Sequence, residues 1–253
     1  MSTAQPDHPV RIGILSTIDD VAALAAQLHL PIAHDDADFD LLLELTPDRL
    51  QLRQPRSKLG PVYCDFIEGA VGYRRRNPQA QAGLLKRAIG WRRTDLPGVV
   101  DATAGLGRDA VMLASLGCAV TAVERSPIIA ALLRDGLERA AHHDSAFRAP
   151  RLVEADARRY LASLDGDHRP DVVYLDPMFP HRGKSAAVKK EMIVCRLAAG
   201  DDGDAGELLA AALAAARNRV VVKRPLRAAA LEGPAPSHAI RGSSVRFDVY
   251  LRR

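Results

Sequence analysis

The chain has 253 residues, of which 47% are hydrophobic and 26% are charged, so it can bury a full α/β core and still carry a smaller unit. Its formal net charge is +4, and its cysteines, Cys64, Cys118 and Cys195, lack the spacing of a disulfide framework or a zinc site. Residues 1–9 show no signal-peptide pattern and no apolar run is long enough to cross a bilayer, so we expect a cytoplasmic protein without membrane contact or bound metal.

Short elements of mixed type occupy the first part of the chain. The patterns predict a strand at 10–15, a helix at 19–28, a hairpin of 39–45 with 49–53, and a basic helix at 77–89. Leu96-Pro97-Gly98 is typical of a domain boundary. We therefore expect an α+β subdomain over residues 1–95 and a second domain over residues 96–253.

Strands and helices alternate from residue 99 onward. Strands are predicted at 99–101, 119–123, 152–153, 172–175 and 220–222, and helices at 108–116, 126–141 and 208–216. Residues 240–251 have the pattern of an antiparallel hairpin. This order is typical of an α/β domain with a doubly wound, mostly parallel sheet and right-handed crossovers.

Acidic residues end or follow four of the predicted parallel strands. They are Asp101, Glu124, Asp156 and Asp176. Because sheets of this kind bind ligands at the carboxyl ends of their strands, we expect these side chains to surround one site.

A glycine-containing turn joins the first of these strands to its helix. Within residues 101–110, Gly105, Gly107 and Ala110 match the pattern G-x-G-x-x-A, and Glu124 lies where an acid would bind ribose hydroxyls. A nicotinamide or flavin dinucleotide fits this pattern as well as S-adenosylmethionine does, because both need a tight turn, a helix amino terminus and a ribose-binding acid.

The loop Asp176-Pro177-Met178-Phe179-Pro180 follows a buried apolar strand and resembles the Asp/Asn-Pro-Pro-aromatic loop of amino-methyltransferases. A carboxylate and a backbone carbonyl can each accept an N–H bond from an exocyclic amine, and an aromatic ring can stack on the base. An ordinary strand-end turn is the alternative, since Asp-Pro is common there. The loop favours a methyl donor over a nicotinamide, because no hydride-transfer apparatus is evident and Asp101 and Asp176 would suit a positively charged sulfonium.

Basic residues are concentrated in three segments that contain no acid. The segments comprise Arg74, Arg75, Arg76, Lys86, Arg87, Arg92 and Arg93; Arg182, Lys184, Lys189 and Lys190; and Arg217, Arg219, Lys223, Arg224 and Arg227. If they converge in space, they form an electrostatic footprint for a polyanion; otherwise they are three separately solvated faces.

Several longer blocks resemble the small-subunit ribosomal RNA methyltransferase J family. They are residues 58–66, 74–76, 101–110, 124–127, 176–181, 184–192, 221–225 and 245–250. The resemblance implies a class I S-adenosylmethionine-dependent methyltransferase fold, a Rossmann-like, mostly parallel seven-stranded sheet with an antiparallel C-terminal hairpin. It also implies methyl transfer to the N2 amine of one guanine in 16S rRNA, either free or in the small ribosomal subunit.

The resemblance, the glycine pattern and the basic segments together give expected roles for individual residues. Those expected at the cofactor are Asp101, Gly105, Gly107, Arg108, Asp109, Glu124, Arg125, Asp156, Ala157 and Asp176. Asp176, Pro177 and Phe179 are expected to hold the guanine for reaction. The residues expected to contact RNA are Arg74, Arg75, Arg76, His181, Lys184, Lys189, Lys190, Lys223 and Arg224, which place part of the RNA contact in the first subdomain. Tyr174, inside its strand, is expected in the core.

Other functions remain open from the residues alone. An amino-methyltransferase could act on DNA adenine or a protein glutamine, because the Asp176 loop does not choose among planar amines. An NAD-dependent oxidoreductase and a catalytically idle RNA-binding domain are alternatives of other classes.

Overall fold

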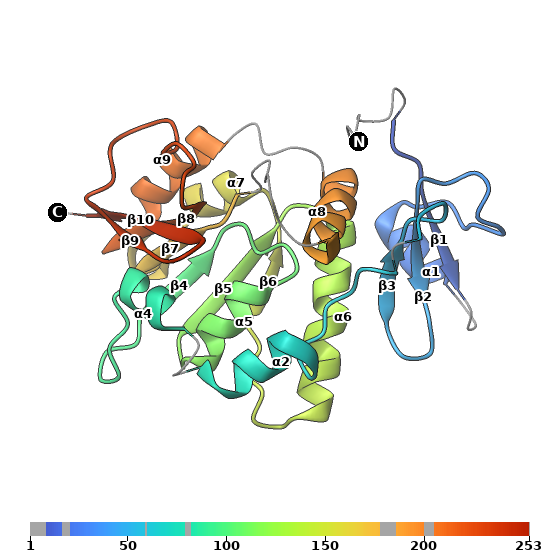
Figure 1. The fold of residues 1–253 in the computed structure, drawn as a ribbon, viewed down its shortest axis with the longest axis horizontal. Coiled ribbons are helices and arrows are strands. Elements are labelled where there is room, and N and C mark those ends of the chain that lie inside the picture. The colour runs from blue at the N-terminus through green and yellow to red at the C-terminus, as the bar shows by residue number, and fades with distance from the viewer. Residues whose placement is uncertain are drawn as a thin grey trace.

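The computed structural model describes residues 9–16, 21–58, 60–78, 82–177, 186–199 and 205–252. They form two sheets, one of three strands and one of seven (Figure 1). None of the helices in these ranges is long and apolar enough to cross a membrane.

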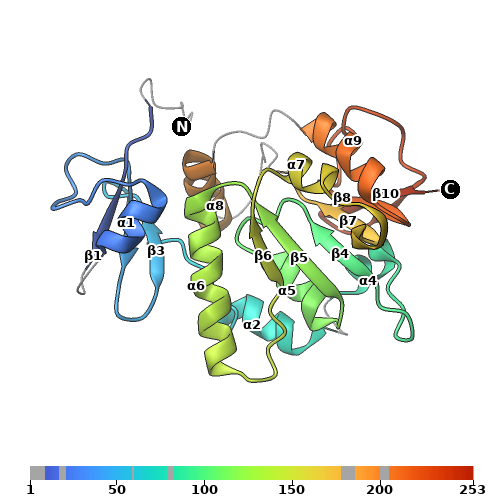
Figure 2. The same cartoon turned by 180° about the vertical axis from the view of Figure 1, so that it is seen from behind.

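The smaller sheet contains β1 (Ile12–Ser16), β2 (Leu41–Leu45) and β3 (Leu50–Arg53), in that order. The predicted hairpin is confirmed, since β2 and β3 pair antiparallel with Leu43 opposite Leu52. The parallel pairing of β1 with β2 was not predicted, and helix α1 (Ala22–Leu28) lies between these strands in the sequence. Strand β3 lies next to α6 (Pro127–His143), and contacts between them join this sheet to the rest of the chain (Figure 2). Their buried side chains share one core.

Two short helices follow the smaller sheet, α2 (Gly69–Arg76) and α4 (Gly83–Ile89). The predicted helix over 77–89 is confirmed in part, since Pro78 is helical and α4 reaches Ile89, whereas Asn77 ends α2 by donating its backbone N–H to the carbonyls of Tyr73 and Arg74. Pro78 follows directly, and the residue before a proline is biased away from helical geometry. Helix α2 contacts α5 (Arg108–Ser115), and α4 contacts the larger sheet, so both pack against the second half of the chain. The division at residue 95 stays a prediction.

The larger sheet has the order β6-β5-β4-β7-β8-β10-β9. Its strands are β4 (Gly98–Asp101), β5 (Ala119–Glu124), β6 (Arg151–Glu154), β7 (Val172–Leu175), β8 (Arg219–Pro225), β9 (His238–Arg241) and β10 (Val245–Leu251). The first five in chain order pair parallel, and β10 pairs antiparallel with both β8 and β9. The predicted seven-stranded sheet with an antiparallel C-terminal hairpin is confirmed.

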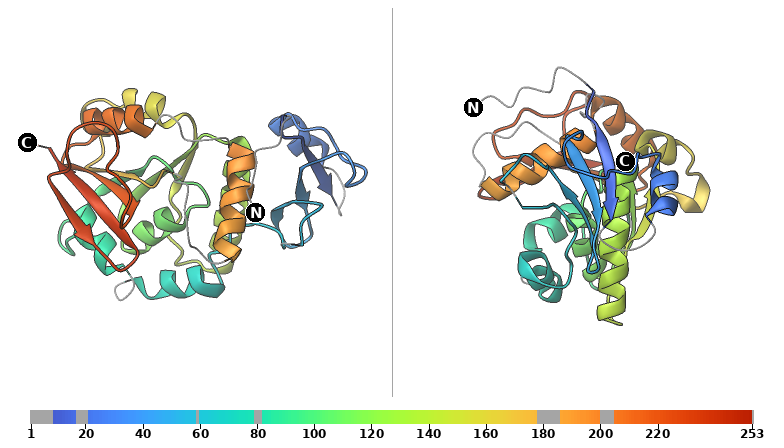
Figure 3. Two further views of the ribbon diagram at one scale, coloured as in Figure 1. Left: turned by 45° about the horizontal axis from the view of Figure 1, so that its top comes forward. Right: turned by 90° about the vertical axis from the view of Figure 1, so that its right-hand side faces the viewer.

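Helices cover both faces of this sheet (Figure 3). One face packs against α4, α5 and α6, and the other against α7 (Ala157–Ala162) and α9 (Ala205–Ala215). Successive residues of each strand serve opposite faces, as Val99 and Val100 do in β4. Helix α8 (Ala186–Ala199) packs on α6, which Ser126 begins by accepting the N–H of Ile129, as the Ser126-Pro127 pattern predicted. Helix α7 was not predicted.

Candidate functional site

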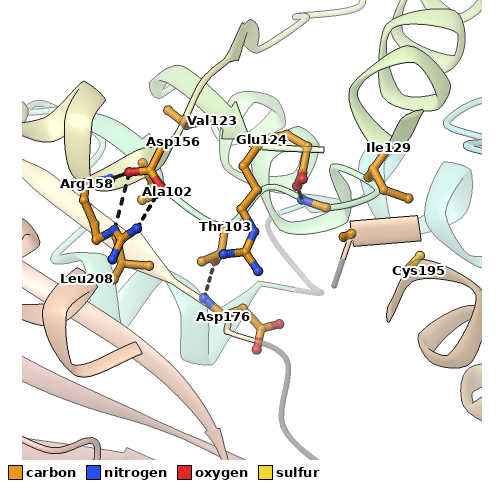
Figure 4. A pocket seen from close by; sticks show the side chains of 14 residues that line it. Ala102, Thr103, Val123, Glu124, Ile129, Asp156, Arg158, Asp176, Cys195 and Leu208 are labelled. Carbon is orange, nitrogen blue, oxygen red and sulfur yellow. Dashed lines mark hydrogen bonds and ion pairs between the residues drawn. The ribbon is translucent and has the colours of Figure 1, made fainter. Parts of the chain in front are cut away.

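A cavity opens at the carboxyl edge of the larger sheet, and we call it the carboxyl-edge cavity (Figure 4). Loops that follow β4, β5, β6 and β7 supply most of its wall, and α6, α8 and α9 complete it. Its lining residues are Ala102, Thr103, Gly105, Val123, Glu124, Arg125, Ile129, Asp156, Ala157, Arg158, Asp176, Cys195, Ala199 and Leu208. Three of the four strand-end acids therefore meet at this cavity.

The glycine loop is tied to the acid of the next strand. Glu124 Oε2 accepts the backbone N–H of Gly105 at 2.9 Å, and Glu124 Oε1 accepts that of Ser126 at 2.8 Å. These bonds fix the carboxylate, which is 8% exposed, at the wall of the cavity. A carboxylate is a suitable acceptor for the hydroxyls of a bound sugar, because each of its oxygens can accept more than one hydrogen bond.

Gly107 is required by its backbone and by its neighbours. It begins α5 with φ of 74°, a left-handed conformation that favours glycine. A Cβ at this position would lie 2.3 Å from Leu133 Cδ1 in α6. A side chain here would both strain the backbone and meet the buried Leu133, so this turn between β4 and α5 favours glycine.

Asp156 caps α7. Its Oδ1 accepts the backbone N–H groups of Arg158 and Arg159 at 3.0 and 3.1 Å, and its Oδ2 lies 3.1 Å from Arg158 Nη2. The hydrogen bond from Arg158 lowers the pKa of this carboxyl below its usual value. Asp156 is thus an ionised, oriented acceptor in the cavity wall.

Asp176 lies at the end of β7, where two other residues orient it. Its backbone N–H donates to Thr103 Oγ1 at 2.6 Å, and its Oδ2 lies 2.8 Å from Lys223 Nζ. Lys223 Nζ also lies 2.6 Å from Asp109 Oδ2, which accepts the hydroxyl of Tyr174 at 2.6 Å. A single lysine therefore joins the carboxylate of the cavity wall to a second carboxylate in α5.

The charges in this cluster affect one another. Although burial opposes ionisation, Lys223 and the Tyr174 hydroxyl hold the pKa of Asp109 below its usual value. Burial, with Asp109 nearby, raises the pKa of Asp101 well above its usual value. Tyr174 is fully buried, as predicted, and burial raises the pKa of its hydroxyl, which stays neutral as a donor. Asp109 is therefore the charged partner of Lys223, and Asp101 favours its neutral form.

Some of the predicted site residues lie elsewhere. Among the described residues, Asp101, Gly107, Arg108 and Asp109 do not line the carboxyl-edge cavity; Asp101 is buried behind it, and its Oδ1 accepts the N–H of Thr103. Phe179, His181 and Lys184 lie outside the described residues, and the side chains of Lys189 and Lys190 in α8 are not described. Pro177 is buried directly after Asp176. The functional roles of all these residues stay predictions.

The sequence patterns did not reveal two polar residues of the cavity wall, Thr103 and Arg158. Thr103 stands two residues after a strand-end acid, and Arg158 two residues after Asp156, so a search for polar neighbours of those acids would have found both. Lys223 was predicted as an RNA contact, whereas the structure places its ammonium between two carboxylates.

Basic residues of the first and third segments meet at two hollows. Arg74 and Arg75 line one with Arg108 and Lys223, and we call it the basic groove. Another hollow is lined by Lys86, Arg87, Arg92 and Arg219. Arg224 is only 5% exposed, so it would have to leave its buried position to touch RNA. Arg76 is exposed and donates to the carbonyl of Ile67. In the described part of the chain, no cluster of His, Cys, Asp and Glu side chains has the arrangement of a metal site.

Comparison with known proteins shows what this chain is similar to. The profile of the SAM-dependent methyltransferase family matches residues 23–252. Ribosomal RNA small subunit methyltransferase J from Thioalkalivibrio sulfidiphilus is 54% identical over 233 residues, which cover 90% of this chain and 91% of that protein. The protein of the same name from Coxiella burnetii is 47% identical over 238 residues, 92% of each chain. The crystal structure of a SAM-dependent methyltransferase from Neisseria gonorrhoeae superimposes with a TM-score of 0.73 at 33% identity, covering 94% of this chain and 95% of that one.

Proposed function

Because this chain belongs to the ribosomal RNA small subunit methyltransferase J family, we propose that it transfers a methyl group from S-adenosylmethionine to the N2 amine of one guanine in 16S rRNA. The observation that carries the proposal is the position of Asp176. Its carboxylate forms part of the same cavity wall as Gly105 and Glu124, so an amine held by Asp176 would lie beside a ligand held by the glycine loop. Family membership also decides between the two cofactors that the glycine pattern left open.

The residues of the carboxyl-edge cavity fit S-adenosylmethionine. Glu124 presents a fixed carboxylate for the ribose hydroxyls, and Asp156 is an acceptor for the adenine amine. Val123, Ile129 and Leu208 supply apolar surface for the adenine ring. When bound, the cofactor supplies a methyl group on a positively charged sulfur, which the acids of this wall favour electrostatically.

The chain's own residues position the target amine. Asp176 would accept one N–H of the guanine amine and the Pro177 carbonyl the other, as the amino-methyltransferase loop implies. Thr103 and Lys223 hold Asp176 in place before substrate arrives, so little reorganisation accompanies the reaction. A strong base is unnecessary, because the methylated ammonium loses its proton readily. Phe179, two residues after Pro177 in the sequence, would stack on the base.

The proposed RNA contact uses the arginines of α2, in the predicted N-terminal subdomain. Arg74 and Arg76 are exposed there, next to an exposed aromatic, Tyr73, on which an unpaired base could stack. Small-subunit rRNA is a cytoplasmic substrate, so we place the protein in the cytoplasm.

The test of this function is the transfer of radiolabelled methyl groups from S-adenosylmethionine. The substrates are unmodified 16S rRNA, small ribosomal subunits and duplex DNA, and nuclease digestion identifies the labelled nucleoside. We expect N2-methylguanosine at a single rRNA position. Label in DNA, or in another nucleoside of the rRNA, would contradict the proposed target.

Glu124→Ala should weaken the binding of S-adenosylmethionine by about 10- to 100-fold, because hydrogen bonds to a charged acceptor each contribute about 1.5–3 kcal/mol. Isothermal titration calorimetry measures the affinity. Glu154→Ala is the matched control, since Glu154 lies opposite Glu124 in the neighbouring strand but does not line the cavity. Equal affinities for the Glu124→Ala and Glu154→Ala proteins would show that Glu124 does not hold the ribose.

A further inference from the structure

The basic groove is lined by residues of α2, α4 and α5. Helices α4 and α5 lie on one face of the larger sheet, and α2 lies beside α5 (Figure 1). The apolar part of the groove comes from side chains of α2, α4, α5 and β10, among them Val71, Leu85, Met112 and Phe247, and Gly83 also lines it. Its charged part consists of four cations, Arg74, Arg75, Arg108 and Lys223, and one acid, Asp109. The groove therefore combines an apolar surface with an excess of positive charge.

This groove and the carboxyl-edge cavity approach each other at one ion pair. Lys223 lines the groove, Asp176 lines the cavity, and Lys223 Nζ lies 2.8 Å from Asp176 Oδ2. A molecule in the groove is therefore separated from the Asp176 carboxylate by the ammonium group of a single side chain.

The cations of the groove differ in how they are engaged. Arg75 is held in the structure, because Nη1 pairs with Asp144 at 2.9 Å and Nε donates to the Phe66 carbonyl. Arg74 is exposed, and it lines the groove together with Arg108 and Asp109 from the start of α5. Arg108 is exposed at the first position of that helix. Arg74 and Arg108 thus project positive charge from two helices toward one opening.

We propose that the basic groove receives the unpaired RNA nucleotide that carries the target amine, an inference that rests on the proposed function. Arg74 and Arg108 bind its phosphates, and the apolar wall contacts its sugar and base. The base edge then points past Lys223 toward Asp176. The base must leave any duplex to reach this position, because its amine is otherwise inaccessible to the carboxylate. Cofactor and target nucleotide enter from opposite sides of the Lys223–Asp176 pair.

Gly83 offers a way to fill the groove without disturbing the fold. It is exposed at the first position of α4, and a Cβ built there meets no atom within 4 Å. Gly83→Trp should therefore place an indole in the groove. It should not destabilise α4, because tryptophan has a higher helix propensity than glycine. Ala210→Trp is the matched control, because Ala210 is exposed on α9 at the other face of the sheet.

A second pair of variants tests charge. Arg74→Glu reverses a cation of the groove, and Arg151→Glu reverses an exposed arginine at the amino end of β6, the opposite edge of the sheet. If Arg74 binds phosphate, its loss should weaken RNA binding. It should also reduce the slope of log affinity against log salt concentration by about one unit.

The experiment measures three quantities for each protein: the dissociation constant for a labelled single-stranded rRNA fragment at several salt concentrations, the affinity for S-adenosylmethionine, and kcat and KM for methyl transfer. Thermal melting confirms that each variant is folded. We expect Gly83→Trp and Arg74→Glu to weaken RNA binding and raise the RNA KM by at least about tenfold, with cofactor affinity unchanged and both controls like the parent protein.

The groove assignment would be overturned if the Gly83→Trp and Arg74→Glu proteins bound RNA as tightly as their controls. An equal loss in the Ala210→Trp and Arg151→Glu proteins would overturn it as well. The proposed function fails separately, if the unaltered protein methylates no rRNA substrate; the binding measurements still decide whether RNA occupies the groove in that case.

Discussion

Replacing Asp176 with alanine should lower kcat for methyl transfer by about 10²- to 10³-fold, the loss typical of removing one preorganised hydrogen-bonding group at a reacting centre. The amine nitrogen of guanine is a poor nucleophile because its lone pair is delocalised into the ring. An N–H bond to the Asp176 carboxylate favours the pyramidal nitrogen that can react. Without the carboxylate, the cavity retains Glu124 and the glycine loop, so the cofactor should still bind.

Single-turnover methyl transfer and calorimetric titration of S-adenosylmethionine, on the same protein, separate these two effects. Asp176→Asn is an intermediate variant, because its amide oxygen still accepts a hydrogen bond but carries no charge. We expect its rate to lie between that of the parent protein and that of the Asp176→Ala protein. Asp165→Ala is the control, since Asp165 is exposed in the loop before β7. A rate for the Asp176→Ala protein within twofold of the Asp165→Ala protein would exclude a catalytic role for Asp176.

The strand-end acids were the most informative feature of the sequence. A parallel sheet places the carboxyl ends of its strands at one edge, so the order of strands and helices along the chain is enough to predict that Glu124, Asp156 and Asp176 lie together. Glu154 shows the limit of the pattern, because it also lies at a strand end but not in the cavity wall. Whether a strand-end acid reaches the cavity depends on the conformation of one or two loop residues, which the hydrophobic periodicity of the sequence does not predict.

Elements that depend on tertiary contacts were not predictable in the same way. The pairing of β1 with β2 joins segments that are separated by α1 and a long connection, and nothing in either segment specifies its partner. Helix α7 has only six residues, among them Arg158 and Arg159, and depends on the Asp156 cap for its start. Lys223 lies in a basic segment that indicated a solvent or RNA contact, yet the fold brings it to two carboxylates that lie 114 and 47 residues away in the sequence.

Lys223 should also be the largest single contributor to stability among the charged residues of the site. Its side chain is 26% exposed, and its ammonium lies within 3 Å of both Asp109 and Asp176. Lys223→Met keeps most of the side-chain volume but leaves these carboxylates without their shared cation. Because loss of one partner from a buried pair costs about 3–5 kcal/mol, and this one is partly exposed, we expect a loss of about 2–3 kcal/mol in the free energy of unfolding at pH 8.

The loss should depend on pH in a defined direction. In the parent protein the pKa of Lys223 is raised, so its contribution is complete below pH 10, and the pKa of Asp109 is lowered, so its contribution is complete above about pH 4. Between pH 5 and pH 8 the ion pair therefore stabilises the parent protein by a constant amount. In the Lys223→Met protein, the largest influence that opposes burial is lost, and Arg74 and the Tyr174 hydroxyl remain. The pKa of Asp109 should therefore rise, so the folded state is increasingly disfavoured as pH rises through this range.

Urea unfolding of both proteins at pH 5, 6.5 and 8 measures this difference. The stability gap should be smallest at pH 5, where the carboxyl of Asp109 can take up a proton, and largest at pH 8. Lys58→Met provides the comparison for loss of an exposed lysine, which should change stability by less than about 0.5 kcal/mol at every pH. A gap that stays constant from pH 5 to pH 8 would mean that Lys223 stabilises the protein through packing rather than through charge.

The Lys223→Met protein should also show a lower kcat with little change in cofactor affinity, because Asp176 would lose the partner that orients its carboxylate.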